Sequence, residues 1–81
     1  MSLNAATITE LSRSIAEDYD DPEVEIMGVS THGGSDRVEL LVSVSLPDAE
    51  AGRQVHMLNL SRTQRTDFER DFRSRLQESF K

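Results

Sequence analysis

The side chains best suited to acid–base or metal chemistry in this sequence are His32, Asp36 and His56. Imidazole and carboxylate groups are common zinc and manganese ligands and common general acids and bases. A minor enzymatic or metal-binding role centred on these three residues is therefore one hypothesis. Little supports it, because the chain has no cysteine, no HExxH motif and no closely spaced pair of histidines. We expect no catalytic constellation, no metal site and no cofactor.

Two adjacent glycines, Gly33 and Gly34, lie beside His32 and have the composition of a phosphate-binding loop. Such a loop leads from a strand into a helix, so that backbone N–H groups converge on the anion. Here the glycines lead from one strand-like run into another. They predict a type I′ hairpin turn, which needs two residues at positive φ. His32 would then lie exposed at the rim of the turn.

The most acidic part of the chain is residues 17–25, which hold six carboxylates. Calcium prefers oxygen ligands, but the run lacks the glycine and the final glutamate of an EF-hand loop. Glu23 and Glu25 alternate as on the solvent face of an edge strand, where charge discourages stray strand pairing. We therefore predict a solvated acidic surface, with a weak divalent-ion or basic-partner site as the alternative.

Length and charge limit what this chain can be. Its 81 residues predict one domain, 1–81, with a thin core. The net charge of −6 is uneven: residues 1–60 contribute −8 and residues 61–81 contribute +2. The lack of cysteine, of a membrane-length apolar run and of a signal-peptide pattern predicts a cytoplasmic protein with no membrane partner.

Two helices are predicted from apolar residues that recur every three or four positions. The first spans about 5–19 and starts at a capping box formed by Thr7 and Glu10, or one turn earlier at Asn4. The second spans about 62–80, with Ser61 and Gln64 as its capping box. The apolar positions of the second helix form a stripe that we expect in the core: Phe68, Phe72, Leu76 and Phe80.

Three strands are predicted between the helices, over about 23–31, 36–46 and 53–60. Residues 37–46 follow a period of two, with an apolar residue at every even position, so one face of this strand is expected to be buried. The first strand slips in phase at Met27 and Gly28, which indicates a bulge. The third strand is ambiguous, because Val55 and Met57 point one way and Leu58 and Leu60 the other.

The connections between these strands are too short for parallel crossovers. They predict an antiparallel meander in the order 1-2-3. With one apolar stripe on each helix, the predicted fold is α+β: a two-layer α-β-β-β-α sandwich with both helices on one face of the sheet.

The third strand carries the strongest functional signal. Its dimer-edge candidates, Val55, Met57, Leu58 and Asn59, lie in a stretch with no lysine, proline or acid to guard an edge. Pairing of two such edges would give a six-stranded sheet in a homodimer. Coverage of the edge by the last helix or by the loop at 46–52 is the alternative. We predict a small non-enzymatic interaction or regulatory module that forms a homodimer and offers its sheet or acidic surface to another protein.

The alternative function is nucleic-acid binding, since α-β-β-β-α is also the element order of double-stranded-RNA-binding domains. Its candidate contacts are His32 and Arg37 near the first inter-strand loop and Arg62 and Arg65 at the start of the last helix. Free N–H groups at that helix start could also bind phosphate. The chain departs from the RNA-binding pattern, because it has no lysine cluster there and its helix arginines alternate with acids. Nucleic acid is therefore the less favoured partner.

Overall fold

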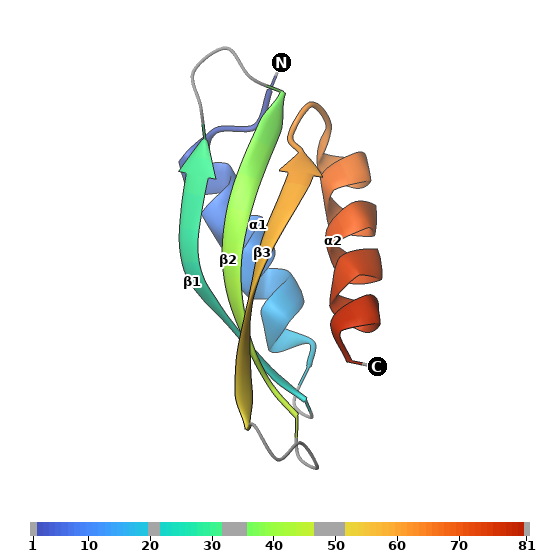
Figure 1. Cartoon of the computed structure of the whole chain (residues 1–81). Coiled ribbons are helices and arrows are strands. Elements are labelled where there is room, and N and C mark those ends of the chain that lie inside the picture. The colour runs from blue at the N-terminus through green and yellow to red at the C-terminus, as the bar shows by residue number, and fades with distance from the viewer. Residues whose placement is uncertain (1, 20–21, 32–35, 47–51, 81) are drawn as a thin grey trace.

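The computed structural model describes residues 2–19, 22–31, 36–46 and 52–80. Its elements follow in the order α1 (Ala5–Glu17), β1 (Glu23–Thr31), β2 (Arg37–Ser45), β3 (Arg53–Ser61) and α2 (Arg65–Ser79). The three strands form one open antiparallel sheet in the order β1-β2-β3 (Figure 1). The predicted α+β class and meander order are confirmed.

The register of the sheet decides which side chains face the helices. β2 pairs with β3 without interruption from Arg37–Ser61 to Ser45–Arg53. The β1–β2 register shifts between Ile26 and Gly28, which confirms the bulge predicted at Met27. 

The ambiguous phase of the third strand is resolved in favour of Leu58 and Leu60. Both are buried, whereas Val55 and Met57 are exposed on the other face. The predicted alternation of β2 also holds, and its buried apolar residues are Val38, Leu40, Val42 and Val44.

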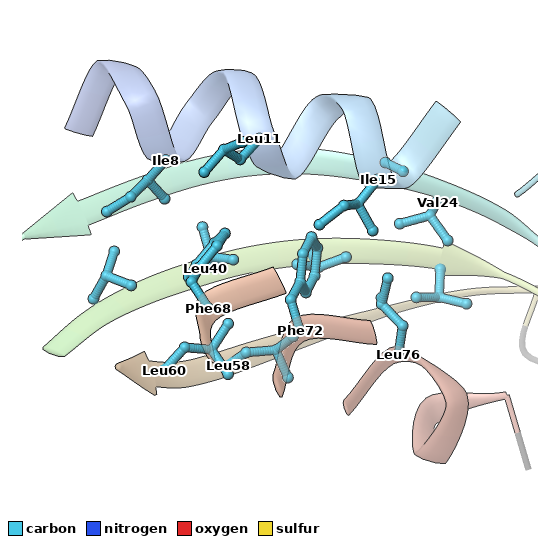
Figure 2. Packing of buried hydrophobic residues seen from close by; sticks show 14 residues of the cluster. Ile8, Leu11, Ile15, Val24, Leu40, Leu58, Leu60, Phe68, Phe72 and Leu76 are labelled. Atoms are coloured by element: carbon cyan, nitrogen blue, oxygen red, sulfur yellow. The ribbon is translucent and has the colours of Figure 1, made fainter. Parts of the chain in front are cut away.

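Both helices contribute to one buried cluster on the helix side of the sheet. α1 contacts β1, α2 contacts β3, and the helices contact each other. Figure 2 shows Ile8, Leu11 and Ile15 of α1 directed toward the strands. From α2, the labelled side chains that complete this cluster are Phe68, Phe72 and Leu76, all fully buried. The predicted stripe is therefore core at these three positions, whereas Phe80, its fourth member, is the C-cap of α2 and packs against the cluster only partly buried.

Neither helix starts at the capping box predicted for it. Asn4 is the N-cap of α1, and its side-chain oxygen accepts from the Thr7 N–H at 2.8 Å. The earlier of the two predicted caps is thus correct. The helix ends at Glu17 rather than at Tyr19, with Asp18 as its C-cap.

The predicted start of the last helix at Ser61 is wrong. Ser61 is the last residue of β3, and its hydroxyl lies 3.1 Å from the Thr63 hydroxyl. Pairing with β2 keeps this segment extended, so α2 begins only at Arg65. Gln64 is its N-cap, without a side-chain capping bond.

Candidate functional site

The direction of the β3 backbone groups follows from one hydrogen bond just beyond the strand. The Arg62 N–H donates to the Asp36 carbonyl at 2.8 Å, which continues the β2–β3 register. Hydrogen-bonded pairs recur at every second residue of an antiparallel ladder. Even-numbered residues of β3, such as His56, therefore direct their N–H and C=O groups toward β2. Odd-numbered residues, including Val55 and Met57, direct theirs to the outer edge of the sheet.

The middle of this edge is open. Within the described ranges, no backbone hydrogen bond reaches the outer groups of Val55 or Met57. Their side chains are also exposed, by 53% and 64%. Unpaired backbone groups beside exposed apolar side chains form a surface on which another strand can pair. We call Val55, His56 and Met57 the β3 edge segment.

The end of the edge is guarded by Arg37. This side chain crosses β3, donating from Nε to the Asn59 side-chain oxygen at 2.7 Å and from Nη2 to the Asn59 carbonyl at 2.9 Å. The Asn59 carbonyl points to the outer edge, so the arginine takes the place of a strand partner there.

α2 also flanks this guarded end. Asn59 and Leu60 share a cleft of about 260 Å³ with Arg37 and with α2 residues Asp71, Ser74 and Arg75. In Figure 1, α2 lies beside the C-terminal part of β3, while the start of β3 extends beyond the helix. Of the two covers considered for this edge, α2 thus lies near Asn59 and Leu60. Residues 47–51 of the other proposed cover lie outside the described residues.

The four candidate edge residues therefore have different surroundings. Val55 and Met57 are exposed at the open segment. Leu58 is 4% exposed and faces the core. Asn59 is exposed but is bound by Arg37.

The face of the sheet opposite the helices carries an apolar hollow that sequence patterns did not reveal. It measures about 250 Å³ and is lined by Gly28, Val29, Ser30, Glu39, Leu41 and Met57. Gly28 opens it, because a β-carbon there would lie 3.8 Å from that of Leu41. The sequence does not predict this hollow, because Gly28 lies opposite Leu41 only through the register shift at the bulge.

An ion pair lies on the same face of the sheet, near the start of β3. Arg53 of β3 reaches across β2 to Glu25 of β1, with Nη1 and Oε2 3.4 Å apart. Ser43 lies between Glu25 and Val55 in the register and is fully buried, although it faces away from the helices. The open face is therefore apolar over Leu41 and Met57 and charged at its Arg53 end.

The arginines proposed for nucleic-acid binding are engaged within the chain. Arg62 donates from Nη1 to the Leu3 carbonyl at 2.8 Å, and the Leu3 N–H donates to the Arg62 carbonyl at 2.7 Å. Arg65 pairs with Glu69 at 3.1 Å. Arg37 binds Asn59. His32, the fourth candidate, lies outside the described residues.

Of the residues considered for metal or acid–base chemistry, the two that the structure describes, Asp36 and His56, are not brought together. Asp36 adjoins the start of β2, whereas His56 pairs with Val42 six positions later, about 20 Å along a strand. His56 is on the helix side of the sheet, and its buried Nε2 has no hydrogen-bond partner among the described residues. In the described part of the chain, no group of three metal-ligating side chains forms. The predicted turn at Gly33 and Gly34 falls outside that part.

The acidic run is spread over the end of α1 and over β1. Glu23 and Glu25 are exposed on an edge strand, as predicted. Asp18 lies 3.8 Å from Arg73. Asp20 and Asp21 are not among the described residues.

A scan against protein-family models, a search of curated proteins and a search of solved structures each find no match to this chain. No helix in the described ranges is both long enough and apolar enough to cross a membrane.

Proposed function

We propose that this protein is a non-enzymatic interaction module that acts as a homodimer through the β3 edge segment. The observation that carries the proposal is the coincidence of two features at Val55 and Met57. Their backbone groups lack a partner in the described chain, and their apolar side chains are exposed. A cytoplasmic location fits the absence of cysteine.

The contrast between the two edges of the sheet supports this proposal. Edge strands of monomeric proteins are usually guarded by charge, proline or a bulge. β1 has such guards, since Glu23 and Glu25 are exposed and a bulge lies at Met27. β3 has neither a charge nor a bulge at Val55 and Met57. A strand from a second copy would satisfy these groups and enlarge a small core.

Nucleic-acid binding remains the alternative function, and the contacts of its arginines disfavour it. Arg62 holds the N-terminal segment, and Arg65 is paired with an acid four residues on. Phosphate binding would have to break these contacts in a chain of net charge −6. Titration of short duplex RNA and DNA at low salt tests it. Binding that weakens steeply with salt would support the alternative, and no binding would remove it.

Sedimentation equilibrium of Met57→Lys, with Met27→Lys as the matched control, tests the homodimer. Met57 is 64% and Met27 54% exposed, so both substitutions should leave the fold intact, but Met27 lies on the opposite edge. Burying the exposed part of Met57 contributes about 1–2 kcal/mol per subunit, or about 2–4 kcal/mol per dimer. Losing it raises the dimer Kd by about 30-fold to 1000-fold.

The expected result is a dimer for the unmodified protein and for Met27→Lys, and a monomer for Met57→Lys at the same micromolar concentration. A monomeric unmodified protein would overturn the proposed homodimer. Dissociation by Met27→Lys, with Met57→Lys still dimeric, would move the interface away from β3.

A further inference from the structure

We infer that the two β3 strands pair antiparallel with His56 on the two-fold axis, so that Val55 lies opposite the partner's Met57. This inference rests on the proposed homodimer and specifies its register. A two-fold axis perpendicular to the sheet keeps both pairs of helices on one side. In an antiparallel pair, side chains directly opposite each other lie on the same face of the sheet. The axis must therefore pass between one residue of β3 and the same residue of the second copy.

The unpaired backbone groups of β3 favour His56 as the residue beside the axis. The outer groups of Val55 and Met57 are free in the described chain, whereas the Asn59 carbonyl already accepts from Arg37. With His56 on the axis, Val55 and Met57 form two symmetry-related hydrogen-bonded pairs, and each pair exchanges both of its backbone bonds. With Met57 on the axis, Val55 would have to pair with the occupied Asn59.

The exposed side chains favour the same register. With His56 on the axis, each exposed Val55 faces the exposed Met57 of the other subunit, and both such pairs are apolar. Shifting the axis to Val55 sets Met57 against the charged Arg53, and shifting it to Met57 sets Val55 against the polar Asn59. Apolar side chains that face each other across two strands stabilise their pairing.

The position of α2 limits the shift in one direction. α2 runs beside β3 from the end of the strand (Figure 1), and three of its residues line a cleft with Asn59 and Leu60. An axis displaced toward Asn59 would bring the two copies of α2 against each other beside the joined strands. An axis at His56 keeps the guarded ends of the two strands apart and joins only their open segments.

Disulfide trapping tests the register, because the chain has no cysteine of its own. Opposite residues of a non-hydrogen-bonded pair have Cα atoms about 4.5 Å apart, within the range of a disulfide. His56→Cys should therefore cross-link to its own copy under mild oxidation, shifting the band to twice the 9.1 kDa chain mass on a non-reducing gel. Val55→Cys and Met57→Cys alone should not, because diagonal residues lie about 7–8 Å apart.

A second measurement guards against loss of the dimer on replacing His56. An equimolar mixture of Val55→Cys and Met57→Cys, which keeps the histidine, should cross-link into the mixed dimer. Self-cross-linking of Met57→Cys or of Val55→Cys alone would overturn the register while leaving the homodimer in place. If every reduced variant and the unmodified protein sediment as monomers, the proposed function fails and the register fails with it.

Discussion

Replacing Arg62 by alanine should destabilise the fold, because this arginine ties the start of the chain to the end of β3. Its Nη1 donates to the Leu3 carbonyl at 2.8 Å, and this bond is partly buried. Leu3 packs against the core, so the bond also holds an apolar residue in place. A hydrogen bond with a charged donor contributes about 1.5–3 kcal/mol, and partial exposure places this one near the lower end. We expect a loss of about 1–2 kcal/mol.

Arg65→Ala is the matched control. Arg65 is also an arginine at the start of the last helix, but its pairing with Glu69 is largely exposed. Exposed pairs of this spacing contribute about 0.3–0.5 kcal/mol, and a positive charge at a helix N-terminus is unfavourable. The two effects nearly cancel, so this substitution should change the stability little.

Thermal unfolding followed by far-UV circular dichroism separates the two variants. In a domain of this size, each kcal/mol shifts the Tm by about 4–8 °C, which predicts a fall of about 4–16 °C for Arg62→Ala. All samples need the same protein concentration, because association raises the Tm of a dimer. Equal Tm values for the two variants would refute a structural role for Arg62. Arg62 would then again be a candidate for nucleic-acid contact.

Two further pairs of substitutions test local features of the fold by the same measurement. Asn4→Ala should cost about 1 kcal/mol by removing the α1 cap, and a Thr7→Ala effect of the same size would instead support the capping box at Thr7. Gly28→Ala should stabilise by about 0.4–1 kcal/mol, since the added β-carbon lies at ordinary contact distance from Leu41 and the unfolded chain loses freedom. Gly52→Ala should destabilise by about 1–2 kcal/mol, because Gly52 has a φ of 69°. A stabilised Gly52→Ala or a destabilised Gly28→Ala would contradict these backbone assignments.

The fold could be predicted because its strongest patterns are local. The period of two over β2 and the four-residue steps from Phe68 to Leu76 each identify an element and its buried face. The start of α2 could not be predicted in the same way. Ser61 and Gln64 have the spacing of a cap, but pairing of Ser61 with Arg37 across the sheet outweighs that local preference.

The candidate site was only partly predictable. An unguarded third strand is visible in the sequence, since Val55 to Leu60 carries no lysine, proline or acid. The sequence does not predict that Arg37 binds Asn59 at the end of this edge, because the two residues are 22 positions apart and are brought together only by the pairing of β2 with β3. The sequence also did not determine which face of β3 is buried; the structure shows Leu58 in the core and Met57 exposed.

Hydrogen exchange at individual backbone amides tests most directly whether the β3 edge pairs with a second copy. The amides of Val55 and Met57 point away from β2, whereas that of His56 points toward it. We predict that all three are protected where the protein is dimeric, and that dilution to the monomer exposes Val55 and Met57 but leaves His56 protected. Fast exchange of Val55 and Met57 at every concentration, beside a protected His56, would contradict pairing at this edge.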